Sequence, residues 1–315
     1  MSKLYRNYIN SSENVEKTYK LMHEHQNLSQ IKEFTDVYDK LIDNLDGNTL
    51  NLWDWSMKLH NFIDESDPDN GLPQIYHAYQ TAESLRRSWM KNDTELTDDL
   101  KIRILFTNKQ WDHIPPEIKQ MYNGYKTINS MYYYIKNWDW LPLLGFVHDL
   151  GKVLALTEFG SLPQYLVVGD TYPLGCPMHP GVIYSEKNYS NEKPYSCEND
   201  TNIGIYNKNI GLENVQMTWG HDEFLARVFV KKGHMLPYLP LEAIYVIRFH
   251  SFYAWHTPID SVENSYFGYS YLANKKDWFM LPLLKMFQKS DLYSKTFNIP
   301  ELDVIESKYR PLLQL

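Results

Sequence analysis

Six histidine and aspartate side chains could do chemistry in this sequence, because they lie in segments that are otherwise apolar or aromatic and predicted to be helical. They are His77, His148, Asp149, His221, His250 and Asp291. An imidazole or carboxylate in apolar surroundings needs a partner, since burying an unpaired polar group costs free energy. A single histidine is most often structural, but one metal cluster would satisfy all six side chains together. The sequence therefore predicts a metal centre built from several different helices.

The adjacent pair His148-Asp149 favours a dinuclear centre. Neighbours on an α-helix point about 100° apart. The two side chains can still converge if the aspartate bridges two metal ions while the histidine binds one of them. Imidazole nitrogen with a bridging carboxylate suits iron, manganese or zinc rather than calcium. The order His…His-Asp…His…His…Asp, spread over separate helices, resembles the HD superfamily of metal proteins.

Other metal and nucleotide motifs fit less well. The Glu-x-x-His pair of ferritin-like di-iron bundles is missing from the sequence. His221-Asp222-Glu223 could begin a two-histidine, one-carboxylate iron triad, but that triad usually lies on a β-barrel, and no barrel is predicted. The sequence also contains no HExxH motif, no P-loop and no glycine motif that opens a nucleotide-binding fold.

Helical spacing of apolar residues dominates the chain, and alternating strand patterns are scarce. We expect one long helix from Ser12 to about Leu45, a second over 52–63, a third from Pro73 to about Arg87, and a fourth over 139–150. Helices resume at Thr218, after Pro240 and around Pro282. Residues 90–136 have an uneven, charged and tyrosine-rich pattern that indicates an insertion with some helix of its own. Residues 156–214 are expected to be irregular, with one short strand at 166–168.

Composition limits the class of protein. The 315 residues are 43% hydrophobic and 15% aromatic, which is ample for a large core. No repeat or linker is visible, so we expect a single catalytic domain over 1–315. A net charge of −8 gives no sign of a nucleic-acid surface. No apolar run has the length of a membrane span, and only two cysteines occur. We expect a cytoplasmic protein that binds neither nucleic acid nor membrane.

Longer stretches of sequence around the six side chains carry a specific resemblance. In order along the chain they are RNY from Arg6, TYKLMHEHQ, DESDPD, HAYQTAE, HDLGK, VVGDTYPLGC, GLENVQMTWGHDE, IRFHSFYAWHT and DLYSK. Together they resemble the myo-inositol oxygenase family, over nearly the whole chain. The resemblance implies an all-α fold, an HD-domain-type helical bundle with a long irregular region and at most short strands. It also implies an enzyme that uses dioxygen to cleave the ring of myo-inositol, giving D-glucuronate. Separately, we expect a monomer.

The resemblance also assigns roles to residues. The six side chains named above would be ligands of two iron ions in a mixed-valent Fe(II)/Fe(III) pair, with Asp149 as the bridge. Lys152 and Asp149 would act in catalysis. The positions that match substrate-binding residues of the family are Arg6, Asp64, Ser66, Lys152, Gly169, Asp170, Ser251 and Lys295. Tyr19 matches a tyrosine in the segment that covers the site.

The chain also departs from the family pattern, and one other enzyme class stays open. His77 and His148 are 148 − 77 = 71 positions apart, more than the family's usual spacing, because of the insertion at about 90–136. The segment TEFGSLPQY from Thr157 also has a few extra residues. The main alternative is an HD-type metal-dependent phosphohydrolase, in which a metal-bound hydroxide attacks a phosphate ester. A binding protein without catalytic activity is a third possibility, and the intact set of six side chains argues against it.

Overall fold

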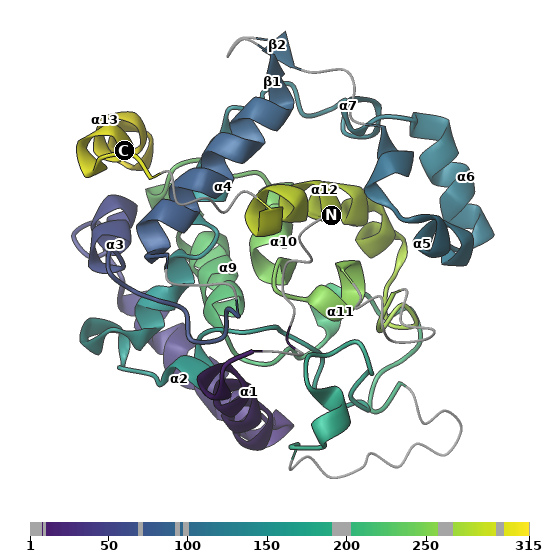
Figure 1. Cartoon of the computed structure of the whole chain (residues 1–315), viewed down its shortest axis with the longest axis horizontal. Coiled ribbons are helices and arrows are strands. Elements are labelled where there is room, and N and C mark those ends of the chain that lie inside the picture. Colours follow the sequence, from purple (N-terminus) through teal and green to yellow (C-terminus); the bar gives the residue numbers. More distant parts are fainter. Residues whose placement is uncertain are drawn as a thin grey trace.

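The structure is a computed structural model that describes residues 8, 11–68, 72–91, 95–96, 101–190, 203–257, 267–293 and 299–314. These residues form an all-α fold, as predicted (Figure 1). The α-helices are α1 (Glu13–His25), α2 (Leu28–Asn44), α3 (Leu52–Lys58), α4 (Gln74–Trp89), α5 (Asn108–His113), α6 (Pro116–Tyr125), α7 (Ile128–Met131), α8 (Trp140–Val147), α9 (His221–Lys232), α10 (Leu241–Phe249), α11 (Tyr253–His256), α12 (Lys275–Tyr293) and α13 (Leu302–Leu313). The strands within the described part are the short antiparallel pair β1 (Met90–Lys91) and β2 (Glu95–Leu96).

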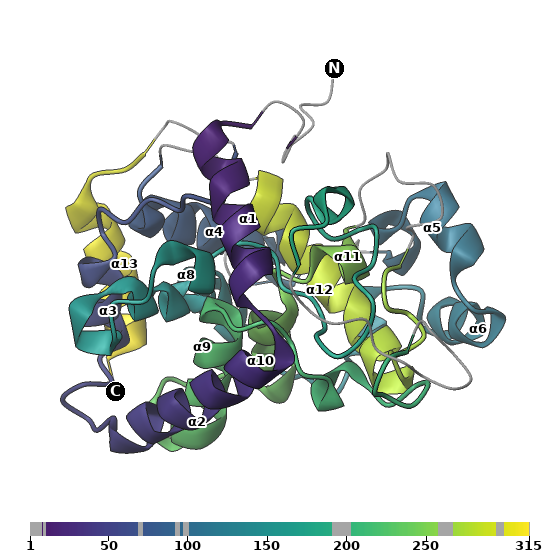
Figure 2. The ribbon, with the colours of Figure 1, turned by 90° about the horizontal axis from the view of Figure 1, so that it is seen from below.

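The prediction of one long helix from Ser12 to Leu45 is wrong, because the chain bends sharply between α1 and α2 (Figure 2). Gln26 is extended, and its side-chain amide exchanges two hydrogen bonds with the backbone of Trp219, at 2.6 and 2.9 Å. Asn27 then caps the new helix by accepting a hydrogen bond from the Gln30 N–H. A side-chain cap and a contact 193 positions away therefore outweigh the continuous apolar stripe.

Five helices surround the centre of the molecule: α4, α8, α9, α10 and α12. α4 packs on α8 and α12, while α10 packs on α9 and α12. The approach of α8 to α4 is close, since a Cβ atom at Gly145 would lie 2.7 Å from the Ala82 Cα. α13 closes one end, where the Tyr309 hydroxyl donates to Glu83 of α4 at 2.7 Å. None of the helices in the described part combines the length and the hydropathy needed to cross a bilayer.

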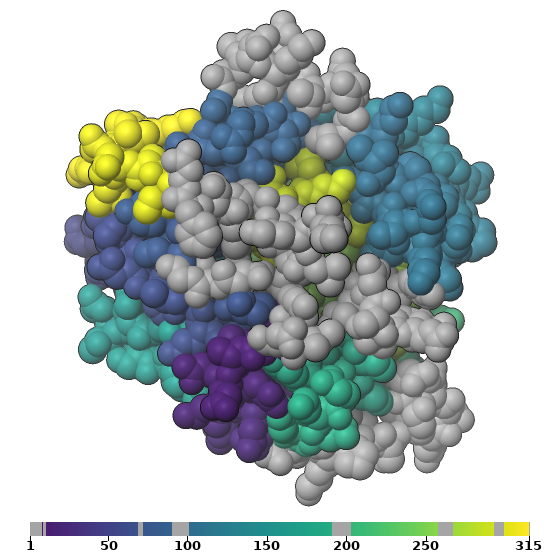
Figure 3. Space-filling model, viewed as in Figure 1, coloured from purple at the N-terminus to yellow at the C-terminus, as the bar shows by residue number. Residues whose placement is uncertain are grey.

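The segment predicted as an insertion does contain helices of its own, α5 to α7, which lie beside α12 (Figure 1). Tyr122 and Tyr132 donate hydrogen bonds to the carbonyls of Trp278 and Phe279, at 2.5 and 2.6 Å. In the space-filling view, residues 101–136 lie on the right of the face and α13 and α3 on the left (Figure 3). The single-domain organisation stays a prediction.

The irregular region is confirmed for its described residues, which contain short 3₁₀ turns such as Leu150–Ala155 and Gln164–Leu166. The predicted strand at 166–168 is wrong. The N–H groups of Val167 and Val168 both point back to the Gln164 carbonyl, and the Val167 carbonyl accepts from His221, so no neighbouring strand is paired. At Gly169, φ is +98° and a Cβ atom would lie 2.1 Å from the Met22 side chain, so this turn requires glycine.

Candidate metal centre

The fold brings all six predicted metal ligands together in its interior, from five different helices. His77 lies one turn into α4, His148 and Asp149 follow the last turn of α8, His221 begins α9, His250 follows α10, and Asp291 lies near the end of α12. Their exposed fractions run from 0 to 7%. Histidine and aspartate are therefore buried here among apolar helices, as their sequence context predicted.

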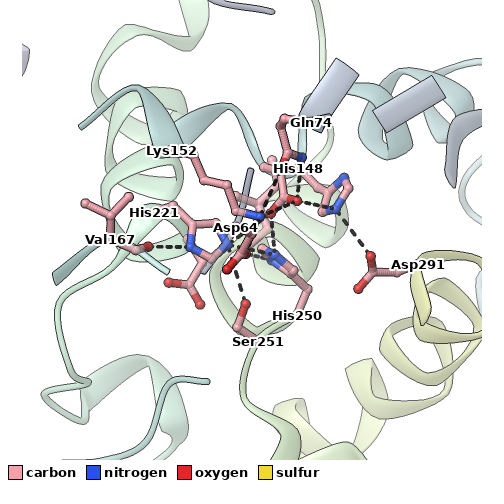
Figure 4. A network of polar contacts seen from close by, with 12 residues as sticks. Asp64, Gln74, His148, Lys152, Val167, His221, His250, Ser251 and Asp291 are labelled. Atoms are coloured by element: carbon pink, nitrogen blue, oxygen red, sulfur yellow. Dashed lines mark hydrogen bonds and ion pairs between the residues drawn. The ribbon is translucent and has the colours of Figure 1, made fainter. Parts of the chain in front are cut away.

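Backbone carbonyls set the orientation of three of the imidazole rings; Figure 4 shows one of these contacts, between His221 and the Val167 carbonyl. The Nδ1 atoms of His148, His221 and His250 lie 2.7–2.8 Å from the carbonyls of Gly145, Val167 and Ile247. A carbonyl can only accept, so in each ring Nδ1 carries the proton and donates it. In the neutral ring Nε2 then has a free lone pair, which is the state in which histidine binds a metal ion.

The donor atoms form two groups that share one carboxylate. Asp149 Oδ2 lies 3.5 Å from His77 Nε2 and 3.3 Å from His148 Nε2. Asp291 Oδ1 completes this first group, at 3.0 and 3.5 Å from the same nitrogens. Asp149 Oδ1 instead faces His221 Nε2 at 3.0 Å and His250 Nε2 at 3.4 Å. Each oxygen of Asp149 therefore belongs to a different set of donors.

These separations fit donor atoms around a common cation. Ligands about 2.1 Å from an ion and at right angles to each other lie about 3.0 Å apart. The His221 and His250 Nε2 atoms are 3.2 Å apart, and neither carries the proton in the tautomers set by the carbonyls. Two lone pairs that face each other repel, so a cation between them would stabilise the arrangement. The two groups could thus each hold a metal ion, one with His77, His148 and Asp149 and the other with Asp149, His221 and His250.

The electrostatic environment also favours positive charge at this centre. Burial would lower the pKa of His148, but Asp149 and Asp291 raise it to about 10, so these carboxylates favour a cation at His148 Nε2, whether a proton or a metal ion. Burial would raise the pKa of Asp149, yet positive charge on His148 and Lys152 holds it well below its usual range. The carboxylates are therefore ionised, which metal ligation requires.

A small cavity borders the metal centre, and several predicted substrate-binding residues line it: Asp64, Ser66, Lys152, Gly169 and Ser251. Lys152 Nζ lies 2.9 Å from Asp64 Oδ2 and 2.9 Å from Asp149 Oδ2. Ser66 donates to Asp64 Oδ1 from its N–H at 2.8 Å and from its hydroxyl at 2.5 Å. Burial would raise the pKa of Asp64, but the Lys152 ammonium and these hydrogen bonds lower it to about 2. The cavity thus combines a charged lysine with hydrogen-bonding groups.

Comparison with known proteins identifies the family. A family model described as myo-inositol oxygenase matches residues 12–116 and 115–314. Inositol oxygenase from Dictyostelium discoideum is 35% identical over 98% of this chain and 86% of its own length. The chain belongs to the myo-inositol oxygenase family. Inositol oxygenase from Danio rerio is 34% identical over 98% of this chain and 89% of its own length. The human inositol oxygenase is 33% identical over 98% of this chain and 87% of its own length.

Some residues that the resemblance nominated are not among the cavity-lining residues, or lie outside the described part of the chain. Asp170 is buried, and its Oδ2 accepts the Ile183 N–H at 3.1 Å; it is not among the described residues that line the cavity. Tyr19 is buried in α1, with its hydroxyl 3.2 Å from that of Tyr8. Arg6 and Lys295 lie outside the described residues. The roles of all these residues stay predictions.

Two glutamines at the site were missed by sequence reasoning. Gln74 donates to Asp149 Oδ2 at 2.7 Å and accepts from Lys152 at 3.1 Å. Gln164 accepts the Glu65 N–H at 2.9 Å and donates to the Ile63 carbonyl at 3.1 Å, so it holds the turn that carries Asp64. Gln74 is one helical turn before His77 in an apolar helix, which is a signal that could have been used. Nothing in the sequence around Gln164 indicates its partner 101 positions away.

Proposed function

We propose that this chain cleaves the ring of myo-inositol with dioxygen and forms D-glucuronate at a mixed-valent di-iron centre. Membership of the myo-inositol oxygenase family supports the reaction. The observation that carries the dinuclear assignment is the division of Asp149, whose two oxygens face two separate groups of donors. The reaction balances without another reductant, because myo-inositol and dioxygen together supply all the atoms of glucuronic acid and one water.

The proposed ligands are His77, His148, Asp149, His221, His250 and Asp291, with Asp149 as the bridge. Imidazole and carboxylate donors suit iron, manganese or zinc, and we choose iron on the resemblance to the myo-inositol oxygenase family. Two iron ions, one ferrous and one ferric, would supply the redox chemistry and would acidify the substrate hydroxyls that they coordinate. The protein would hold the histidines in the required tautomer through the carbonyls of Gly145, Val167 and Ile247.

The cavity residues would bind and orient an uncharged polyol. Asp64 is ionised and could accept substrate hydroxyl protons in hydrogen bonds, while Ser66 and Ser251 could donate or accept. Burial would lower the pKa of Lys152, but Asp149 and Asp64 raise it, so this buried side chain keeps its charge. An ammonium in this position would stabilise negative charge that develops on a substrate oxygen. We include Arg6, Gly169, Asp170 and Lys295 in the proposed substrate site on the family resemblance.

We also infer an HD-type relationship of the helical bundle, a cytoplasmic location and a monomeric state. The order of the six proposed ligands along the chain supports the HD relationship. The sequence contains only two cysteines, and this sparse usage supports a reducing compartment. Light scattering of the purified protein would test the monomer.

Anaerobic reconstitution tests the function. The purified chain is loaded with ferrous iron, partly oxidised, and given myo-inositol and dioxygen. We expect two bound irons per chain and one glucuronate formed per dioxygen consumed. A protein that binds two irons without forming glucuronate would disprove the assignment. Release of phosphate from nucleotides in the absence of oxygen would instead support the hydrolase.

A further inference from the structure

Gln74 is the one glutamine in the described residues lining the cavity, and it contacts the proposed bridge and the proposed catalytic lysine at once. It is the first residue of α4 and is 4% exposed. Its backbone N–H donates to the Phe62 carbonyl at 2.9 Å, two positions before Asp64. The side chain is therefore held at its base by the backbone and reaches into the site with its amide (Figure 4).

The chemistry of the two partners determines how the amide is oriented. The amide nitrogen faces Asp149 Oδ2 at 2.7 Å, and the amide oxygen faces Lys152 Nζ at 3.1 Å. An ionised carboxylate can only accept and an ammonium can only donate, so the reversed orientation would lose both bonds. Gln74 thus recognises one negative and one positive group, and it does so without adding charge to the centre.

Lys152 has all three of its N–H groups engaged in this arrangement. They donate to Asp64 Oδ2 at 2.9 Å, Asp149 Oδ2 at 2.9 Å and Gln74 Oε1 at 3.1 Å. Two of these partners carry charge and the third is the neutral amide. The direction in which the ammonium points is therefore determined by three acceptors, and Gln74 provides the one that does not come from a carboxylate.

The orientation of Asp149 Oδ2 is also set in part by its hydrogen bond from Gln74. This oxygen accepts from Gln74 and Lys152 on one side and faces His77 and His148 on the other. A hydrogen bond to a ligating carboxylate sets its orientation and its strength as a donor to the metal ion. The amide N–H of Gln74 acts on the oxygen of the first donor group, while Oδ1 faces the second.

From these contacts we infer that Gln74 is a positioning residue, which orients the bridging carboxylate of Asp149 and the ammonium of Lys152 relative to each other. This inference rests on the proposed function for its effect on turnover. Its effect on the metal centre itself can be measured without substrate.

The test replaces Gln74 by methionine, which has a similar volume and neither a strong donor nor a strong acceptor. The matched control is Gln110→Met, because Gln110 is also buried and its amide oxygen also accepts from a buried lysine, Lys285, at 3.2 Å. For Gln74→Met we expect unchanged iron content, a kcat lowered about 10- to 100-fold and a KM within about threefold of the wild type. The electron paramagnetic resonance signal of the mixed-valent pair should also shift before substrate is added. Gln110→Met should change neither kcat nor the signal.

Several results would overturn the inference. One is a kcat and a resonance signal in Gln74→Met equal to those of Gln110→Met. Another is a loss of activity that only follows a loss of iron. If Gln74→Met does not fold, Gln74→Glu keeps the shape and the acceptor for Lys152 but removes the amide donor to Asp149, and a wild-type signal and kcat in that variant would also refute the role. Failure of the wild type to form glucuronate would refute the proposed function alone. The inference on Gln74 would still be tested, because the resonance signals of Gln74→Met and Gln110→Met can be compared without substrate.

Discussion

Asp149→Ala should reduce metal binding from two ions to at most one. In the wild type the carboxylate belongs to both donor groups. Without it, His77, His148 and Asp291 still offer three donors to one ion. His221 and His250 alone offer only two donors to the other. We therefore expect the second group to lose its ion and the first to bind more weakly.

The size of the effect can be worked out for thermal unfolding. An ion at about 100 times its Kd stabilises the folded state by about 2.7 kcal/mol, so two ions contribute about 5.4 kcal/mol. With an unfolding entropy of about 2.1 cal/mol/K per residue, the 315-residue chain requires about 0.66 kcal/mol per degree. Metal should then raise the Tm of the wild type by about 8 °C, and that of Asp149→Ala by about 4 °C or less.

The assay is differential scanning calorimetry of metal-free and metal-loaded protein, together with the metal content. Asp222→Ala is the matched control, since Asp222 also follows a histidine of the site and is buried, but its carboxylate accepts from Thr171 and from the Glu223 N–H. It should lower the Tm of both forms and keep the full rise on metal binding. If Asp149→Ala keeps two ions, the same rise in Tm and the coupled di-iron spectrum, the bridge is wrongly assigned.

Three further predictions concern charge and loop position. The pKa of Asp64 is lowered from 3.8 to about 2. Its ionised form therefore contributes about 2 kcal/mol to the free energy of unfolding above pH 4, and this contribution is lost as the pH falls towards 2. Urea unfolding of Asp64→Asn should lack that loss, and a pH dependence equal to that of the wild type would contradict the prediction. Gln164→Ala should raise the KM for myo-inositol several-fold with unchanged iron content, because the Ile63 carbonyl and the Glu65 N–H lose their hydrogen bonds to the Gln164 side chain. An unchanged KM would exclude a role of Gln164 in holding the turn that carries Asp64. Burial lowers the pKa of His23 from 6.5 to about 4, so the neutral ring stabilises the fold above pH 6.5 and up to about 3 kcal/mol is lost between pH 6.5 and 4. The unfolding free energy of His23→Phe should therefore fall by about 3 kcal/mol less than that of the wild type over that range, and a wild-type pH profile would refute the assignment.

The expectations that depended on local pattern were largely confirmed. The period of the apolar residues indicated an all-helical chain, and the thirteen helices of the described part agree with it. Six polar side chains in apolar helices indicated a buried cluster, because each of them needs a partner, and the fold does bring them together. The long sequence motifs led to the family that the comparisons show.

The two expectations that failed each involve a contact with a distant part of the chain. Gln26 ends α1 through the backbone of Trp219, 193 positions away. The N–H groups of Val167 and Val168 bond locally to the Gln164 carbonyl, and the Val167 carbonyl accepts from His221, 54 positions away, instead of from a strand. Periodicity reports which face of an element is buried, and it contains no information about which distant group competes for a particular N–H or carbonyl.

The sequence by itself determined the class of fold and the identity of the six proposed ligands through residue type and spacing, and its long motifs indicated the family by resemblance. Only the tertiary structure decided which nitrogen of each ring faces the centre and how the oxygens of Asp149 are divided between two groups. It also brought Gln74 to a carboxylate 75 positions away and Gln164 to the turn that holds Asp64. These features are distances and directions between segments that meet only after folding, so no local pattern of residues encodes them.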